Sequence, residues 1–212
     1  SYVSDITQFT KRITYLIDEF NNVIILAFDS KAYDGTFTIP ETIWNKPVTT
    51  IHEDAFEYCH NLSSITIPKT VTTIGENAFR DCSKLTEIIV SSENVNYSDI
   101  NGVLFNKLKT TLISFPRGNG VTTYTIPNGV TTIGDSAFNK NSSLTSINIP
   151  ASVTTIGISA LNECSELTIV TFLGTVPDLY GKNSFAYDTE DKSVVYYIED
   201  PTNNTSDYFS KR

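Results

Sequence analysis

The stretch VTTIGENAFRDCSKLTEIIV, residues 71–90, is the most informative part of the sequence, because the chain contains three near-copies of it. They are VTTIHEDAFEYCHNLSSITI from Val48, VTTIGDSAFNKNSSLTSINI from Val130 and VTTIGISALNECSELTIVTF from Val153. The starts lie 23 residues apart within each pair and 59 apart between the pairs, which equals one coil of 23 residues and one of 36. A repeat period between about 20 and 50 residues indicates a solenoid of stacked coils.

Each copy ends in a pattern that predicts a β-strand with one buried face. In the first copy the apolar Ile65 and Ile67 are separated by Thr66, and a similar alternation recurs in the other copies. Successive side chains of a strand point to opposite faces, so this period of two places the apolar residues inside. We therefore expect each coil to supply one strand, stacked about 4.8 Å from the strand of the next coil.

The segment GENAFRDC, residues 75–82, predicts a single helical turn before the strand. Its glycine permits a sharp entry, and acidic or polar residues follow where the N-terminus of a helix favours them. Ala78 leaves room for the neighbouring coil, and Phe79 fills the interior. The predicted fold is an α/β solenoid of 23-residue coils, each with one strand and one short helical turn.

Residues 1–212 are predicted to form a single domain. Residues 1–36 form an N-terminal cap in which ITYLIDEFNNVIILAFD predicts a hairpin, and residues 176–212 form a C-terminal cap with the strand SVVYYIEDP. The repeats occupy residues 37–175, and their irregular 36-residue coil at residues 94–129 predicts a further hairpin from about Val103 to Phe115. Caps are expected because bare coil edges expose unpaired main-chain groups.

The repeat units resemble the BspA-like leucine-rich repeats of bacterial surface proteins. The resemblance rests on VTTIGENAFRDCSKLTEI, where AF is followed by Cys or Asn and then by LTxIxIP, and on NGVLFNKLKTTLISFP, which is similar to the family's irregular repeat. It covers roughly residues 37–198. The resemblance implies a leucine-rich-repeat solenoid, a right-handed β-α superhelix, in a secreted or surface-anchored protein. Some members are adhesins that bind host matrix or other cells, and the family has no shared catalytic residues.

Composition argues against several classes of protein. A formal net charge of −9 and a pI near 4.6 disfavour nucleic-acid binding, which needs clustered Lys and Arg. The longest apolar run, Val23 to Phe28, is far shorter than the roughly 20 residues that cross a bilayer. The chain has no Met and starts at Ser1, so we expect a mature or trimmed fragment whose targeting sequence lies outside it.

Three cysteines predict a structural ladder. Cys59, Cys82 and Cys164 occupy the same offset of their coils, and Asn141 takes that place in the coil of Val130. A thiol there acts as a small buried group, and an Asn hydrogen-bonds to the turn backbone. Adjacent coils would bring two of the thiols close together, but parallel side chains give poor disulfide torsions. We therefore expect free thiols.

No constellation of residues predicts catalysis, a cofactor or a metal site. The histidines are His52 and His60, and nothing in the pattern brings either beside a nucleophilic Ser or Cys. A zinc site needs four ligands at characteristic spacing, and neither C-x-x-C nor H-x-x-x-H occurs. Glycine-rich phosphate motifs are also missing. We therefore expect a non-catalytic protein without a cofactor.

The exposed face of the strand ladder is the first candidate binding surface. It is polar and nearly uncharged, it includes an unexpectedly apolar Ile89, and solenoids commonly bind partners on extended concave surfaces. The alternative is that Thr simply suits a solvated strand. The candidate residues are Thr38, Ser64, Thr66, Glu87, Ile89, Thr125, Ser146, Asn148 and Thr171.

The second candidate surface is the insertion of residues 94–127, which carries side chains of types enriched in interfaces. These are Tyr97, Phe105, Phe115, Arg117 and Tyr124. Such aromatics more often cover the core beneath a hairpin. The sequence thus predicts an extracellular or cell-surface protein-binding module that adheres to a protein or glycoprotein of host matrix or other cells, and the alternative is a structural spacer in a larger surface protein.

Overall fold

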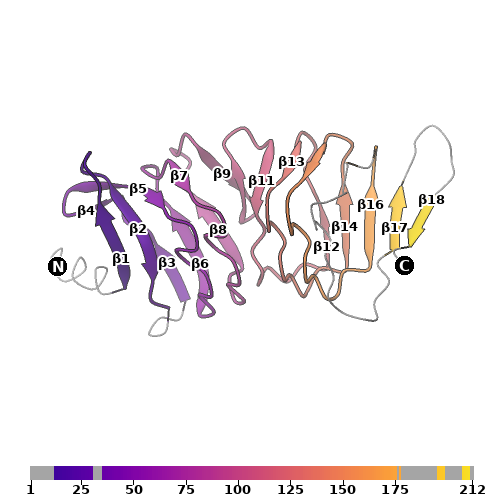
Figure 1. Ribbon diagram of the computed structural model, residues 1–212, viewed down its shortest axis with the longest axis horizontal. Helices are drawn as coiled ribbons and strands as arrows, with labels where there is room; N and C mark the ends of the chain where they lie inside the picture. Colours follow the sequence, from indigo (N-terminus) through magenta and orange to yellow (C-terminus); the bar gives the residue numbers. More distant parts are fainter. Residues whose placement is uncertain (1–11, 31–34, 176, 178–194, 199–206, 211–212) are drawn as a thin grey trace.

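The computed structural model describes residues 12–30, 35–175, 177, 195–198 and 207–210, and it is a β-solenoid whose coils lie side by side along the long axis (Figure 1). All regular secondary structure among these residues is β-strand. The first nine are β1 (Ile13–Ile17), β2 (Val23–Phe28), β3 (Gly35–Thr38), β4 (Thr42–Ile43), β5 (Lys46–Ile51), β6 (Leu62–Ile67), β7 (Thr73–Ile74), β8 (Glu87–Val90) and β9 (Tyr97–Ile100). The others are β10 (Val103–Asn106), β11 (Thr111–Ser114), β12 (Thr123–Thr125), β13 (Thr132–Ile133), β14 (Ser146–Ile149), β15 (Thr155–Ile156), β16 (Ile169–Phe172), β17 (Val195–Ile198) and β18 (Asp207–Ser210).

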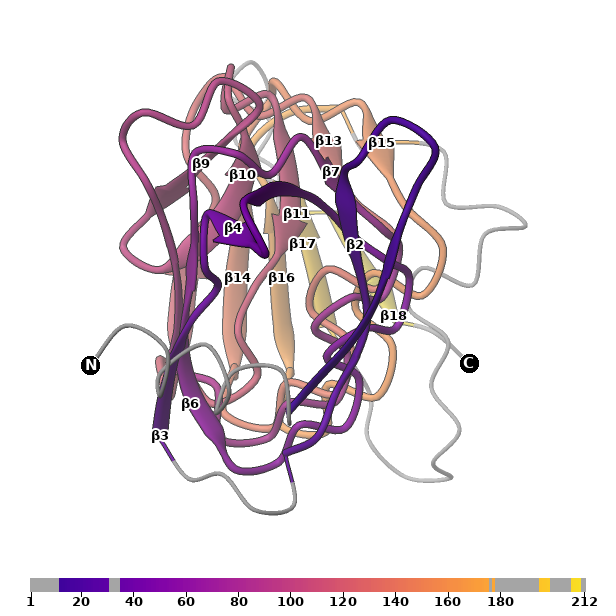
Figure 2. The ribbon, with the colours of Figure 1, turned by 90° about the vertical axis from the view of Figure 1, so that its left-hand side faces the viewer.

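Each regular coil supplies two strands, which belong to separate sheets and can be followed along the stack in Figure 2. The strands predicted at the end of each repeat are present as β6, β8, β14 and β16, and they pair in parallel with equivalent residues aligned, as Ile65 with Ile88. The second strand, such as β7 or β15, is a two-residue TI segment. It was not predicted, because two residues show no periodicity.

The predicted helical turn is wrong, and so is the α/β class that depended on it. In the segment of residues 75–82, Asn77 has a φ of 54° and Asp81 a φ of 59°, whereas a right-handed helix needs negative φ throughout. The same two offsets have positive φ in the other copies, at Asp54, Tyr58, Ser136, Lys140, Ser159 and Glu163. The turn therefore alternates between right-handed and left-handed backbone.

This alternation directs main-chain groups toward the neighbouring coil. The N–H of every second residue donates forward, as Phe56 N does to Ala78 O at 2.8 Å and Phe138 N to Ala160 O at 2.7 Å. A helix would have used the same donors within one coil. The turns thus form a hydrogen-bonded ladder, and pairing between coils replaces pairing within a helix.

Glycine at the start of the turn permits close contact between coils. A Cβ on Gly75 would lie 2.3 Å from Glu53 N, and one on Gly157 would lie 2.5 Å from Asp135 N. Neither glycine has a positive φ, so the predicted role of glycine, to permit a sharp entry into the turn, is wrong. Its role is to leave space for the main chain of the neighbouring coil. The coils can approach this closely only where no side chain intervenes.

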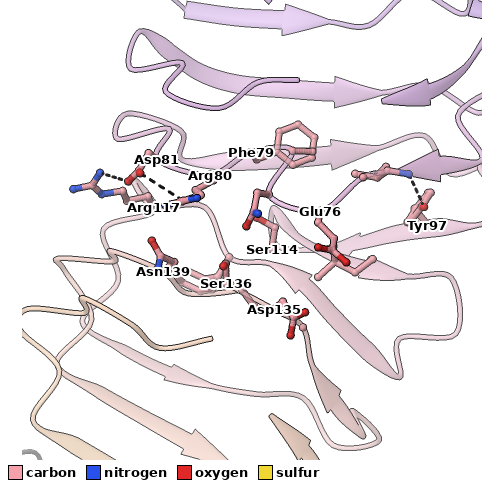
Figure 3. Close-up of a pocket in the computed structure, with 18 residues that line it drawn as sticks. Glu76, Phe79, Arg80, Asp81, Tyr97, Ser114, Arg117, Asp135, Ser136 and Asn139 are labelled. Carbon is pink, nitrogen blue, oxygen red and sulfur yellow. Dashed lines mark hydrogen bonds and ion pairs between the residues drawn. The ribbon is translucent and has the colours of Figure 1, made fainter. Parts of the chain in front are cut away.

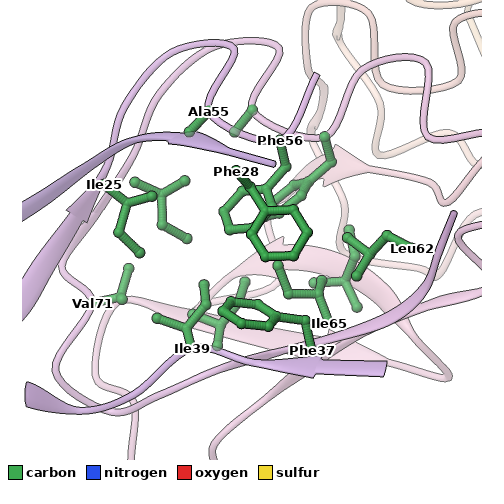
Figure 4. Close-up of a cluster of buried hydrophobic side chains, with 14 of the residues drawn as sticks. Ile25, Phe28, Phe37, Ile39, Ala55, Phe56, Leu62, Ile65 and Val71 are labelled. Carbon is green, nitrogen blue, oxygen red and sulfur yellow. The ribbon is translucent and has the colours of Figure 1, made fainter. Parts of the chain in front are cut away.

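The core consists of side-chain ladders inside the coils, as Figure 4 shows for the N-terminal half. Phe56 stacks between Phe28 and Phe79, with ring centroids at 5.2 and 5.7 Å, and Phe115 stacks on Phe138 at 4.9 Å. The buried apolar side chains divide into two clusters, one from Ile13 to Leu104 and one from Val103 to Phe172. The division falls at the irregular coil.

The cysteine ladder is confirmed. Cys59, Cys82 and Cys164 are free and buried, and the thiols of Cys82 and Cys164 each donate to a phenylalanine carbonyl of the preceding coil at 3.0 Å. Asn141 accepts from Leu144 N at 2.9 Å, as expected for an Asn in this position. Burial raises the pKa of Cys164 to about 12, which keeps that thiol protonated and unreactive at neutral pH.

The predicted hairpins are present. β1 and β2 pair antiparallel, and β2 continues in parallel onto β5, so the hairpin covers the first edge of the stack. In the irregular coil β9, β10 and β11 form an antiparallel meander, and β11 joins β13 in parallel. The predicted strand SVVYYIEDP is β17, which pairs with β16 and with β18.

Candidate functional site

The strand face is divided between two sheets. In the first, β3, β6 and β8 align Thr38, Thr66 and Ile89 in one row, and Ser64 with Glu87 in another. We call this the first panel. Thr38, Glu87 and Ile89 are exposed, and Thr66 is half-buried. Ser64 is only 5% exposed, so it offers no accessible hydroxyl and differs from the other predicted residues.

The second panel repeats the arrangement on β12, β14 and β16. Thr125, Asn148 and Thr171 form its row, and Ser146 aligns with Ile169. The amide of Asn148 donates to Thr125 Oγ1 at 3.0 Å, which fixes its orientation on the surface. Thr125 is exposed and the other two residues of the row are half-buried. Both panels therefore present hydroxyl groups, the second adds the amide of Asn148, and each has one exposed isoleucine.

The turn between β9 and β10 separates the two panels. Ile88 N donates to Gly102 O at 2.8 Å, and Val90 N donates to the Asp99 carboxylate at 2.9 Å, so this turn lies beside β8 where the next strand would pair. Gly102 has a φ of 77°, and a Cβ there would lie 2.5 Å from the Cβ of Glu87. β8 does not pair with β12, and the single continuous face that the sequence predicted is interrupted.

Most aromatic residues of the insertion contribute to the core. Phe105 and Phe115 are buried, and Phe115 packs edge-on against Tyr124 with ring centroids at 4.8 Å. Burial raises the pKa of Tyr124 to about 12. The Tyr97 hydroxyl accepts from Ile74 N at 2.9 Å and so satisfies the edge of β7. Of the predicted second surface, the structure thus leaves Arg117 and parts of the two tyrosines accessible.

A cavity of about 250 Å³ lies where the two core clusters meet, on the side of the turns (Figure 3). We call it the junction slot. One lip is the turn of residues 75–81, the other is the turn of residues 134–139, and Ile113–Phe115 form the floor. Tyr97 lies at one end, and the pair of Arg117 and Asp81 lies at the other (Figure 3).

The slot exists because the irregular coil is short at this point. Leu112 pairs with Ile133 in parallel strands. Phe115 follows Leu112 by three residues, whereas Phe138 follows Ile133 by five. The irregular coil therefore lacks two residues of the turn that fills the same space in every regular coil.

Asp81 bridges the junction with a set of ion pairs. Its side chain is 2% exposed, and its carboxylate lies 3.0 Å from both Arg117 and Lys140 and 3.8 Å from Arg80 Nε. Sequence analysis did not predict this cluster. The available signal was the opposite charge of Asp81 and Lys140 at the same offset of two coils, but the irregular coil between them concealed their proximity.

Neither a metal site nor a membrane span emerges from the part of the chain that the structure describes. No three His, Cys, Asp or Glu side chains gather there in a way that could hold a metal ion. The described residues also contain no helix of the length and hydropathy that a bilayer crossing requires. His60 contacts the hydroxyl of Ser83 at 3.2 Å, but both residues are exposed.

The chain belongs to the BspA type leucine-rich-repeat family. The family model matches residues 26–120 and 114–206 with six copies of the repeat. The match identifies a repeat scaffold, a class whose members are typically non-catalytic, and indicates no catalytic family. Comparison with curated proteins finds no match.

Several solved structures of bacterial leucine-rich-repeat proteins are similar. One from Eubacterium ventriosum is 22% identical, with a TM-score of 0.51 over 82% of this chain and 75% of that one. A leucine-rich cell surface protein from Faecalibacterium prausnitzii is 30% identical, with a TM-score of 0.51 over 64% of this chain and 41% of that one. The pneumococcal vaccine antigen PcpA is 24% identical, with a TM-score of 0.49 over 60% and 43%. The chain spans less than half the length of the last two.

Proposed function

We propose that the chain is an extracellular or cell-surface module that binds a protein or glycoprotein partner, and that it contributes to adhesion to host matrix or other cells. Membership of the BspA type family and the likeness to a Faecalibacterium cell surface protein support this location. The partner contacts the two panels of the strand face. It makes these contacts without catalysis and without a cofactor.

The observation that carries the proposal is the chemistry of the panels. Each combines polar side chains with one isoleucine, Ile89 at 38% exposure and Ile169 at 39%. The row of Thr38, Thr66 and Ile89 carries no charge, and neither does the row of Thr125, Asn148 and Thr171. Hydroxyl, amide and apolar contacts depend little on ionic strength, because screening acts on charge.

A triple variant tests the proposal. Thr66→Lys, Ile89→Lys and Asn148→Lys together should abolish binding to immobilised matrix proteins or to epithelial cells, while leaving the melting temperature nearly unchanged. The matched control is Thr72→Lys, Thr131→Lys and Thr154→Lys, at exposed positions on the short-strand side, which should bind normally. Binding by the wild type should change little between low and physiological salt. If a broad panel of matrix proteins and cells shows no binding at all, the module acts as a spacer.

A further inference from the structure

The junction slot interrupts the hydrogen-bonded ladder of the turns. In the first regular coil the N–H groups of Asp54, Phe56 and Tyr58 all donate to carbonyls of the next turn, at 3.2, 2.8 and 3.0 Å. The equivalent donors one coil later are Asn77, Phe79 and Asp81. Within the described residues none of these three N–H groups donates a hydrogen bond. The first lip is therefore a row of unpaired donors.

The second lip carries the complementary groups. In the regular coils the carbonyls at the offsets of Asp135, Ala137 and Asn139 accept from the preceding turn. Here Ala137 O accepts from Phe115 N at 2.8 Å, and no donor among the described residues reaches the other two carbonyls. The slot thus has donors along one lip and acceptors along the other, in the same spacing that the chain uses to pair its own turns.

Two side-chain atoms add to these main-chain groups. Arg80 Nε and Asn139 Oδ1 are buried and have no hydrogen-bond partner in the described part of the chain. Both residues line the slot, one on each lip. Buried polar atoms without a hydrogen-bond partner destabilise a fold, so a ligand that supplies those hydrogen bonds binds more tightly.

We propose that the junction slot binds an extended peptide segment of a partner protein, which replaces the turn missing from the irregular coil. Its carbonyls accept from Asn77, Phe79 and Asp81, and its N–H groups donate to the carbonyls of Asp135 and Asn139. Addition of a strand-like segment to an unpaired main-chain edge is an established mode of recognition, in which main-chain hydrogen bonds provide affinity.

The dimensions and charges of the slot define the segment further. A volume of about 250 Å³ is below the roughly 300–1,000 Å³ of pockets for drug-sized molecules, which favours a thin main-chain segment with small side chains. Glu76 and Asp135 lie toward the Tyr97 end and Arg80 toward the other (Figure 3), so a basic side chain of the segment fits the first end and an acidic side chain fits the second.

A random linear peptide library displayed on phage and selected against the full chain tests the proposal. We expect peptides that slow hydrogen exchange at the amides of Asn77, Phe79 and Asp81. Ser114 lies between the lips in Figure 3, so Ser114→Trp should fill the slot and weaken a selected peptide by at least about tenfold, whereas Ser114→Ala should bind normally. A two-residue insertion, Gly-Asp, between Ile113 and Ser114 restores the regular coil length and should abolish binding even if the Trp variant fails to fold.

The outcomes separate this site from the strand face. Selected peptides should bind the triple variant with Lys at residues 66, 89 and 148 as well as they bind the wild type, and main-chain N-methylation of the peptides should abolish binding. The proposal is overturned if no peptide is enriched, if binding survives both the Trp variant and the insertion, or if the three amides are already protected without peptide. None of these results depends on whether the panels bind a matrix protein.

Discussion

The regular coils and the irregular coil achieve the same burial with different hydrogen bonding. In the regular coil that starts at Val48, three main-chain N–H groups of the turn donate to the next coil. The irregular coil of residues 94–129 keeps one such bond, from Phe115 N to Ala137 O. Its extra residues form the β9–β10 hairpin, whose turn accepts a hydrogen bond from β8 at Gly102 O. The insertion thus preserves the core, but it divides the strand face and leaves a slot between the turns.

The largest expected effect concerns the phenylalanine ladder. Phe56 is fully buried between two other rings, so Phe56→Ala should lower the free energy of unfolding by about 3–5 kcal/mol. Phe79 stacks on Phe56 but borders the junction slot, so Phe79→Ala leaves a cavity that is already partly open. We expect Phe79→Ala to lower the free energy of unfolding by about 1 kcal/mol less than Phe56→Ala, because the new cavity contributes less.

Denaturant titrations of the two variants provide the measurement. The slope of unfolding free energy against urea should stay constant, so that midpoints alone report the difference. Equal losses for Phe56→Ala and Phe79→Ala would mean that the junction is packed as tightly as a regular coil. That result would also remove the structural basis of the slot.

The strands were predictable from sequence because burial imposes a local pattern. Leu62, Ile65 and Ile67 line one face, and apolar residues recur at these three offsets in every copy, although Ile89 and Ile169 replace polar residues on the outer face of two copies. The turn was not predicted correctly, because the direction of its N–H groups depends on a neighbouring coil. A signal was nevertheless present, since the first positive-φ position is occupied by Asp54, Asn77, Ser136 or Ser159, and small polar residues of this kind tolerate left-handed backbone.

The junction slot could not be predicted from the sequence, for a different physical reason. The 36-residue length of the irregular coil predicted an insertion and the hairpin within it, but the register of β11 against β13 determines where Phe115 lies. That register depends on the packing of both core clusters. The burial of Ser64 and of Asp81 likewise depends on neighbouring coils. The sequence therefore predicted the rows of strand residues, but neither their division into two panels nor the slot.

The second prediction concerns the ion pairs of the junction. Asp81→Asn leaves Arg117 and Lys140 without their shared carboxylate, and we expect a loss of about 2 kcal/mol in the free energy of unfolding. The side chains of Arg117 and Lys140 are each about one quarter exposed, so water partly solvates their charges in the variant. The cost therefore stays below that of breaking a fully buried ion pair. The control is Glu93→Gln, whose solvent-exposed pair with Lys69 should contribute much less.

Thermal melts in low and high salt distinguish the two pairs. The effect of Asp81→Asn should persist at about 1 M salt, because a buried carboxylate is poorly screened, whereas the small effect of Glu93→Gln should disappear. If Asp81→Asn and Glu93→Gln were equally mild, the ion pairs of Asp81 would contribute little to holding the two halves of the stack together.

The smallest expected effect compares the regular and irregular coils through their response to alkaline pH. Burial raises the pKa of Cys164, in a regular coil, and of Tyr124, in the irregular coil, to about 12 in each case. The unfolded values are about 9 for the thiol and about 10 for the phenol. Because both pKa values are higher in the folded chain, the folded state binds more protons, and stability falls as pH rises above the unfolded pKa.

The two groups should therefore act in different pH windows. At pH 10 ionisation of the unfolded thiol should destabilise the fold by about 1 kcal/mol, and that of the unfolded phenol by less than about 1 kcal/mol. Cys164→Ala should flatten the decline that begins near pH 9, whereas Tyr124→Phe should flatten only the part that begins near pH 10. Urea titrations between pH 7 and 11 give both slopes. If stability declined with pH equally in both variants and in the wild type, burial would not raise the pKa of either group.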